Sequence, residues 1–157
     1  MKQWNRVIAS AVLLALGAGA YCQESDLVAR CLGKPLSVYA KTFNQPGTET
    51  RKTPQGTETY SEYKTGSARI DVIQSPGAKV PNIVNLGFYQ QPKYDWKLAL
   101  KVAGLSSAGV TAKVDSKHKV HLSHVKAPHA IVASAVFVPM SDKYPDGPEL
   151  HITLKKK

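Results

Sequence analysis

Short segments with alternating side chains, separated by Pro and Gly, make up most of the chain after residue 47. Such alternation is typical of half-buried β-strands, and Thr53-Pro54-Gln55-Gly56 has Pro and Gly where a type I turn requires them. Strands joined by tight turns pair antiparallel. The predicted strands are Thr48–Lys52, Thr57–Lys64, Ala68–Gln74, Val110–Val114, Lys119–Val125, Ala130–Val138 and Glu149–Leu154.

Three further segments have helical periodicity. Ser25 can cap the first, over Asp26–Leu32, and Pro35 suits the first turn of the second. Asp95 caps the third helix and Gly104 ends it. The predicted class is therefore α+β, with short helices packed on antiparallel sheet. A helix-helix-three-strand unit is followed by a helix plus four-strand unit.

Pro and Gly gather between these two units, from Ser75 to Pro81. Such a composition is typical of a linker. The chain is thus predicted to divide into residues 21–75, a linker at 76–82 and residues 83–157. Because the linker is short, the two units are expected to pack as one compact body. A brief apolar run, Ile83–Tyr89, precedes the third helix, and Ala130–Val138 is apolar enough on both faces to predict a central strand.

Residues 1–20 have the three parts of a secretory signal peptide. Two cations precede the apolar run Val7–Leu16, and Gly17–Ala20 supplies the small residues that signal peptidase requires. Cleavage is expected near Ala20 or Cys22. The apolar run is shorter than the about 20 residues of a membrane helix. The protein is predicted to be exported, periplasmic or secreted, without a transmembrane segment in the mature chain, and an uncleaved N-terminal anchor is the alternative.

The charge balance favours anionic partners. The sequence holds 21 Lys and Arg against 11 Asp and Glu. Without the leader, which contains Lys2 and Arg6, 19 cations and a net charge of +8 remain. A basic surface attracts acidic proteins, lipid headgroups or polyanions over a long range. The alternative is that the charge only keeps an exported protein soluble.

The two cysteines are Cys22 and Cys31. In an oxidising compartment they can form a structural disulfide between the mature N-terminus and the first helix. If cleavage falls before Gln23, Cys22 is lost and Cys31 is a lone thiol. No Cys-x-x-Cys is present, which argues against thiol redox catalysis.

One stretch of the first unit has a familiar spacing. Gly33, Phe43 and Pro46 bracket a short amphipathic helix, and the aromatic strand Tyr60-Ser61-Glu62-Tyr63 follows. These residues resemble the SmpA/OmlA family of outer-membrane assembly lipoproteins, which shares the β-lactamase-inhibitor-protein-like fold. Asn44 replaces the family's glycine, and Asn also accepts a left-handed conformation. The resemblance covers the first half only, and it implies an exported module that binds another protein and has no chemistry of its own.

Four histidines are candidate metal ligands: His118, His121 and His124, with His151 brought nearby by strand pairing. On one strand His118 and His124 would lie roughly 20 Å apart, while His121 would point to the other face. A metal site needs ligands that converge on one ion. No cofactor is therefore predicted, and a small metal-dependent enzyme built on this cluster is the weaker alternative.

Patterns for other catalysis are weak. The stretch from Gly104 to Gly109 lacks the Gly-x-Ser-x-Gly spacing, and it follows a helix where a serine elbow follows a strand. Glu58 and Glu62 share a strand face but lie about 13 Å apart. The sequence has no His-Glu-x-x-His, P-loop or dinucleotide fingerprint. These patterns favour a protein without catalytic activity.

Aromatic and basic residues instead gather on the second and third predicted strands: Tyr60, Tyr63, Lys64 and Arg69. Aromatic and Arg side chains contribute most interface energy. We therefore predict a sheet face rich in Tyr, Thr and basic residues that binds a protein in the cell envelope or outside the cell. The alternative is electrostatic attachment to an anionic cell surface or polyanion, released by moderate salt. Export argues against nucleic acid as the target.

Overall fold

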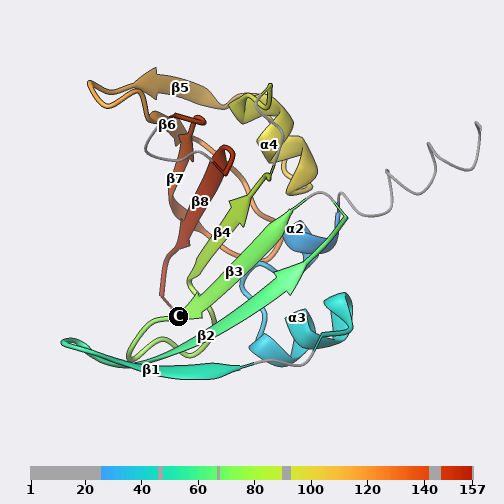
Figure 1. Ribbon diagram of the computed structural model, residues 1–157, viewed down its shortest axis with the longest axis vertical. Coiled ribbons are helices and arrows are strands. Elements are labelled where there is room, and N and C mark those ends of the chain that lie inside the picture. The colour runs from blue at the N-terminus through green and yellow to red at the C-terminus, as the bar shows by residue number, and fades with distance from the viewer. Residues whose placement is uncertain (1–25, 46–47, 67, 90–92, 142–145, 157) are drawn as a thin grey trace, which may run out of the picture.

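The computed structural model describes residues 26–45, 48–66, 68–89, 93–141 and 146–156. Within these ranges the chain forms three short helices and eight strands (Figure 1). The helices are α2 (Leu27–Cys31), α3 (Leu36–Phe43) and α4 (Trp96–Val102). The strands are β1 (Glu49–Thr53), β2 (Gly56–Lys64), β3 (Arg69–Gln74), β4 (Ile83–Gly87), β5 (Thr111–Val114), β6 (Val120–Ser123), β7 (Val132–Val138) and β8 (Glu149–Leu154). The predicted α+β class is confirmed.

All eight strands belong to one open antiparallel sheet, in the order β1-β2-β3-β4-β8-β7-β6-β5. Strands β1 to β4 follow one another across one half of the sheet, and β5 to β8 across the other. The two runs meet where their last strands pair, at β4 and β8 (Figure 1). In this central pair Asn85 lies opposite His151, and Gly87 lies opposite Glu149.

Strand β4 is the one strand that alternation does not predict. It lies within the apolar run Ile83–Tyr89, and it pairs on both sides, with β3 and β8. Val84 and Leu86 are fully buried on one face, and Ile83 and Asn85 are partly buried on the other. A strand so enclosed needs no polar side chain at every second position.

The segment predicted as a linker connects two strands that pair directly. Residues 76–82 lie between β3 and β4, which are antiparallel neighbours. The N–H of Ala78 donates to the carbonyl of Ser75 at 3.0 Å, and the N–H of Ser75 donates to Asn82 Oδ1 at 2.9 Å. These bonds fold the segment back on itself, so that it closes a hairpin.

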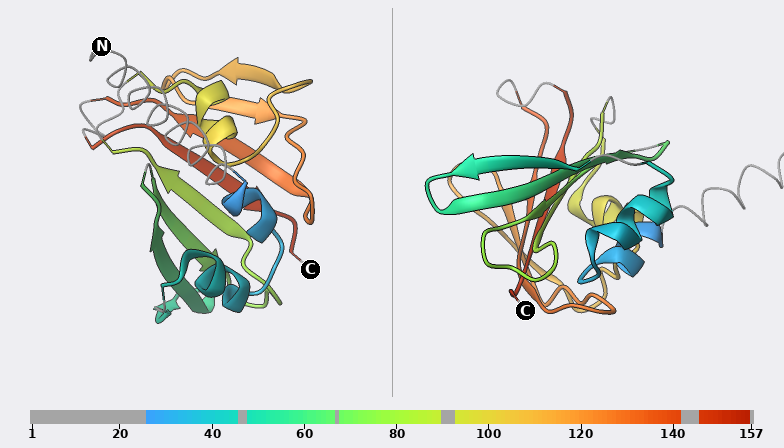
Figure 2. Two further views of the ribbon diagram at one scale, coloured as in Figure 1. Left: turned by 90° about the vertical axis from the view of Figure 1, so that its right-hand side faces the viewer. Right: turned by 90° about the horizontal axis from the view of Figure 1, so that it is seen from below.

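The hydrophobic core lies between the helices and one face of the sheet (Figure 2). Strand side chains on that face are buried: Ile70, Val72, Val84, Leu86, Leu150 and Ile152. Tyr63 of β2 packs against α3, with its ring centroid 6.2 Å from that of Tyr39 and 5.4 Å from that of Phe43. Since successive strand residues point to opposite faces, the side chains between these buried ones form the second face of the sheet.

The helix ends follow local sequence rules. Asp95 Oδ1 accepts a hydrogen bond from the N–H of Leu98 at 2.8 Å, which confirms the predicted cap of α4. After α3, Asn44 adopts the left-handed conformation expected of it, with φ of 50°. Ser25, the predicted cap of the first helix, lies outside the described residues. Asp26 at the start of α2 forms no capping bond through its side chain.

Strand β7 lies between β8 and β6, one position from the central pair. Its register shifts between Val132 and Ser134, where Ala133 and Ser134 are exposed.

In the described ranges, no helix combines the length and apolar character needed to cross a bilayer. The leader predicted at residues 1–20 lies outside those ranges.

Candidate functional site

The sheet face that points away from the helices is the candidate interaction surface. The three helices all lie on the other side (Figure 2), and we call the uncovered side the open face. Tyr60, Ile73 and Ile83 lie opposite one another on β2, β3 and β4, and the open face holds these residues and every second residue along each strand. Its charged residues are Glu49, Arg51, Glu58, Glu62, Lys64, Arg69, Asp71, Lys113 and Glu149.

The open face is mixed in charge. It holds five carboxylates and four cations, whereas the other described residues include 13 Lys and Arg against four Asp and Glu. The sequence predicted a basic sheet face, but the positive excess of the protein lies elsewhere. Three of the four cations on this face lie close to a carboxylate two residues away on the same strand, in the pairs Arg51–Glu49, Lys64–Glu62 and Arg69–Asp71.

Tyr60 and Asp71 are the most connected residues of the open face. The hydroxyl of Tyr60 donates to Asp71 Oδ1 at 2.8 Å, and Arg69 Nη2 lies 3.2 Å from Asp71 Oδ2. The guanidinium of Arg51 stacks over the Tyr60 ring, 3.7 Å from its centroid. Burial, followed by the hydrogen bond to Asp71, raises the pKa of Tyr60 to about 12. The hydroxyl therefore stays protonated and keeps donating at neutral pH.

Gly87, the last residue of β4, leaves a notch on the open face at one end of the central strands. Its neighbours in register are Arg69 on β3 and Glu149 on β8. The glycine itself is buried, yet a Cβ placed on it would have no heavy atom within 4 Å. Tyr89 is 42% exposed, and its ring centroid lies 5.4 Å from the Arg69 guanidinium. The notch thus has a cation on one side and a carboxylate on the other.

Two polar atoms near the notch are shielded and lack a hydrogen bond. Arg69 Nε and Asn85 Oδ1 have no partner among the described residues. Asn85 lies between Asp71 and His151 in the register. A shielded polar atom without a hydrogen bond costs about 1–3 kcal/mol. An incoming group that reaches these atoms could therefore add hydrogen bonds at this end of the open face.

The Glu149–His151 pair borders the same region. His151 Nε2 lies 2.7 Å from Glu149 Oε2. This hydrogen bond, helped by the charges of His151 and Arg69, lowers the pKa of Glu149 although burial acts in the opposite direction. A carboxyl group whose pKa is lowered by folding stabilises the fold above its unfolded pKa, and this contribution disappears as the pH falls through the folded value.

We therefore expect Glu149→Gln to lower the free energy of unfolding more at pH 7 than in acid, where the wild-type carboxyl is protonated as well. Urea unfolding at several pH values measures the difference. The change in stability should shrink below the usual Glu pKa of about 4.3. A difference that stays constant over this range would contradict the assigned pair.

The structure separates the four residues predicted to bind a partner. Tyr60, Lys64 and Arg69 lie on the open face, in adjacent strands. Tyr63 lies on the opposite face, is 1% exposed and packs against α3. Tyr60 and Tyr63 are an odd number of residues apart, so the alternation of β2 already required opposite faces. Asp71, Asn85 and Gly87 were missed because no local pattern distinguishes them.

The candidate metal ligands do not converge. His118 and His124 occupy turn positions with positive φ, 61° and 65°. His121 Nε2 lies 2.8 Å from Asp115 Oδ2, and Val136 of β7 separates His121 from His151 in the register. The described residues contain no group of three or more His, Cys, Asp or Glu that could hold a metal ion.

The predicted disulfide stays a prediction, because Cys22 lies outside the described residues. Cys31 is the last residue of α2 and is fully buried. Burial raises its pKa, which opposes formation of the reactive thiolate. Cys31 in this conformation therefore belongs to the core.

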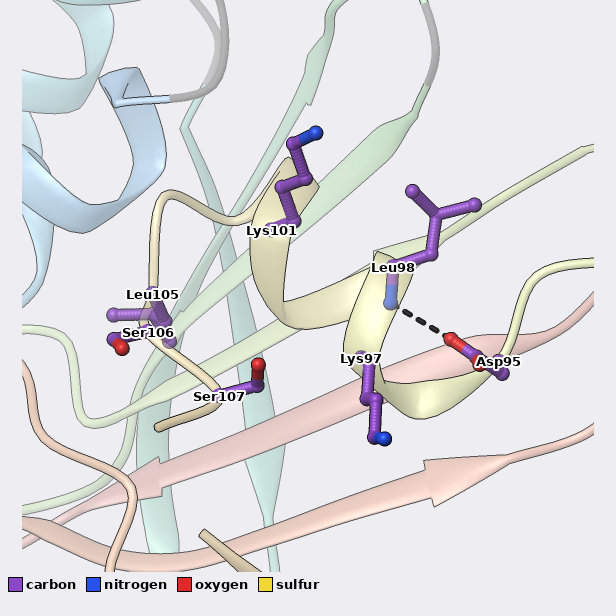
Figure 3. Close-up of a pocket in the computed structure, with 7 residues that line it drawn as sticks. All are labelled: Asp95, Lys97, Leu98, Lys101, Leu105, Ser106 and Ser107. Atoms are coloured by element: carbon purple, nitrogen blue, oxygen red, sulfur yellow. Dashed lines mark hydrogen bonds between the residues drawn. The ribbon is translucent and has the colours of Figure 1, made fainter. Parts of the chain in front are cut away.

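A hollow beside α4 contains the two serines of the segment from Gly104 to Gly109 (Figure 3). Ser106 Oγ accepts a hydrogen bond from the N–H of Ala108 at 3.1 Å. Asp95, the carboxylate of this hollow, accepts the bond from Leu98. The lining consists of Asp95, Lys97, Leu98, Lys101, Leu105, Ser106 and Ser107. A serine nucleophile needs an adjacent base. The carboxylate of this lining, that of Asp95, is already engaged as the cap of α4.

Comparison of the chain with protein-family models, curated proteins and solved structures found no match.

Proposed function

We propose that the protein is an exported binding module without catalytic activity, which engages a protein partner through the open face. The observation that carries the proposal is the notch at Gly87 with two unsatisfied polar atoms beside it. Interface hot spots cluster near the centre of a contact, in Tyr, Trp and Arg side chains. Arg69 and Tyr89 supply such side chains beside the notch, and Tyr60 lies farther along the same face on β2.

The chemistry of the notch narrows the kind of contact. A partner's carboxylate would be repelled by Glu149, and its Lys or Arg would be repelled by Arg69. A neutral group that both donates and accepts, such as a side-chain amide, meets neither repulsion. It can accept from Arg69 Nε and donate to Asn85 Oδ1 once the shielding side chains turn aside on docking. The proposed partner is therefore a protein that projects a neutral polar side chain within a surface of alternating charges.

The leader and the family resemblance belong to the same proposal. Residues 7–20 would direct export. The similarity of residues 33–63 to SmpA/OmlA lipoproteins would make the chain a non-catalytic adaptor. In this view the chain consists of a helix-helix-three-strand unit followed by a helix plus four-strand unit, and the two halves share one binding surface.

Filling the notch is expected to abolish partner capture without disturbing the fold. Gly87→Val places its Cβ where no heavy atom beyond the chain neighbours lies within 4 Å, in a strand residue without positive φ. A steric block at a hot spot typically costs an interface about 2 kcal/mol or more, which corresponds to roughly 30-fold in affinity. Capture from the envelope fraction, with wild-type and variant protein as paired baits, measures the loss.

The matched control is Ser37→Val, which adds a branched side chain at an exposed position of α3, on the helix side. Its capture should equal that of the wild type. Urea unfolding should give similar stabilities for all three proteins. If Gly87→Val is folded and captures the same partners at the same strength, the open face is not the binding surface.

A further inference from the structure

We propose that two copies of the chain pair through β5, an outer strand of the sheet, in a symmetric antiparallel contact. Strand β5 pairs with β6 on one side, and no strand of the described residues lies on its other side (Figure 1). An outer strand presents unpaired backbone N–H and C=O groups, which can pair with a further strand. The inference concerns this edge and does not depend on the partner proposed for the open face.

The hydrogen bonds of the β5–β6 hairpin indicate which backbone groups of β5 point outward. The N–H of Asp115 donates to the carbonyl of Lys119 at 2.9 Å, where the hairpin closes. In an antiparallel pair, residues bonded to the partner strand alternate with residues whose groups point the other way. The odd-numbered residues of β5 therefore bond to β6, and the N–H and C=O groups of Ala112 and Val114 point away from the sheet.

The side chains at these two positions are apolar and exposed. Ala112 and Val114 lie opposite Leu122 and Val120 of β6, on the side of the sheet that faces the helices. All four residues of β5 are nevertheless exposed, and Val114 is 61% exposed. An exposed apolar edge favours association, because pairing satisfies its backbone groups and removes apolar surface from water.

The other outer strand of the sheet, β1, has a different character. It carries three charged residues, Glu49, Arg51 and Lys52. Arg51 lies 3.3 Å from Glu49 and stacks over the ring of Tyr60. Charged side chains, and lysine in particular, are typical of edges that are protected against pairing. Of the two edges, β5 is therefore the one suited to association.

The order of residues along this edge favours a second copy of the chain over an unrelated strand. From Val110 to Val114 the segment reads Val-Thr-Ala-Lys-Val, with apolar residues placed symmetrically about Ala112. In an antiparallel pair centred on Ala112, Val110 of each copy lies opposite Val114 of the other, and Thr111 lies opposite Lys113. Like charges do not face each other, and the apolar side chains form one row across the contact, which stabilises a strand pair.

The hairpin that carries β5 is held in place before any pairing. Asp115 Oδ1 accepts hydrogen bonds from the N–H groups of Lys117 and Lys119, at 2.8 Å and 3.0 Å. Asp115 Oδ2 lies 2.8 Å from His121 Nε2. The bond to His121, helped by the two backbone donors, lowers the pKa of Asp115 to about 2, so the carboxylate stays ionised at neutral pH. A strand that is already ordered loses little conformational freedom on association.

The symmetry of the pair has a consequence for the open face. Residues directly opposite each other lie on the same side of a sheet, so the twofold axis of the dimer is perpendicular to the sheet. The sheets of the two copies then continue into one another, and both open faces lie on the same side. The dimer presents two notches, one at each Gly87, on a single surface.

Sedimentation equilibrium of the protein, purified in its exported form, tests the proposal. The paired segment is one short strand, and contacts below the size of stable interfaces are weak, so we expect a dissociation constant on the order of 0.1 mM. The average mass should rise from that of one chain at about 10 μM towards that of two chains at about 1 mM. The rise should persist in about 0.5 M salt, because salt screens charges and not apolar contacts.

Ala112→Pro removes the N–H group at the centre of the contact. Proline is tolerated in an outer strand where the N–H points to solvent, and the bonds to β6 use other residues. Because each dimer loses two hydrogen bonds, the dissociation constant should rise about 30-fold. Ala112→Val keeps the N–H and should keep the dimer. Urea unfolding verifies that both variants are folded.

A second pair of variants tests the edge through its side chains. Val114→Lys alters both valine pairs of the dimer and leaves every backbone donor in place, and the dissociation constant should rise about fivefold or more. The matched control is Ile131→Lys, which makes the same change in charge at an apolar residue ahead of β7 that is 63% exposed. In about 0.5 M salt the control should change the dissociation constant less than about twofold.

A wild-type protein that stays monomeric at about 1 mM would overturn the inference and leave this edge to a strand of another protein. The inference also fails if a folded Ala112→Pro variant dimerises like the wild type, or if both lysine variants weaken the dimer equally. Gly87→Val lies in β4 on the open face and should leave the monomer–dimer equilibrium unchanged. Failure of this inference and failure of the proposed function can therefore be told apart.

Discussion

Replacing Tyr63 by alanine is expected to lower the free energy of unfolding by about 4 kcal/mol, because truncating a packed aromatic side chain costs about 3–5 kcal/mol. Tyr63 is 1% exposed, and its ring contacts Tyr39 and Phe43 of α3. The truncation would leave a cavity where α3 meets the sheet. Urea unfolding measures the change, and the melting temperature should fall by roughly 8–16 °C in a chain of this size.

Two companion variants make this test specific. The hydroxyl of Tyr63 is buried and has no partner among the described residues. Tyr63→Phe should therefore leave the stability unchanged or raise it by up to about 1 kcal/mol, because it removes an unsatisfied polar group. Tyr60→Ala, on the open face, should cost about 1.5–3 kcal/mol, because it removes a hydrogen bond to the Asp71 carboxylate. A larger loss in Tyr60→Ala than in Tyr63→Ala would mean that the two faces have been assigned the wrong way round.

Gly147→Ala is expected to destabilise the protein by about 4 kcal/mol, the sum of backbone strain and overpacking at about 1–3 kcal/mol each. Gly147 has a φ of 140°, and a Cβ there would meet the backbone carbonyl of Phe88. That backbone cannot easily retreat, because the N–H of Phe88 donates to the carbonyl of Pro148 at 3.0 Å. The clash would therefore act on the start of the central β4–β8 pair.

The control is Gly87→Ala, in one strand of the same central pair. Gly87 has no positive φ, and its Cβ would have no heavy atom within 4 Å. Replacing a strand glycine without a clash should leave stability unchanged or raise it by about 0.5–1 kcal/mol. Thermal and urea unfolding of both variants measure the contrast. Similar stabilities for Gly147→Ala and Gly87→Ala would contradict the close approach of residues 147 and 88.

Local patterns predicted most elements of this fold. The strands β1, β2, β3, β5, β6, β7 and β8 lie within two residues of predicted boundaries at each end, because each alternates or is bounded by turn residues. The cap of α4 at Asp95 followed from residue type alone. Strand β4 was missed because its enclosed position permits an apolar run, which has no period that distinguishes a strand.

The candidate site was predicted only in part. Tyr60, Lys64 and Arg69 come from adjacent strands of one hairpin, so a local pattern could bring them together. Glu149 and His151 join them only through the pairing of β4 with β8, whose partners are more than 60 residues apart in the chain. No local signal specifies such a pairing, because it depends on which hydrophobic faces can be buried together.

The amino-acid sequence by itself determined the α+β class, the alternation of each strand and the net positive charge, since these depend on residue type and on neighbours a few positions away. The tertiary structure decided which side chains share the open face and where the notch at Gly87 lies. The physical reason is that strand pairing and helix packing join residues distant in sequence, and burial of one sheet face then assigns every second residue to the other.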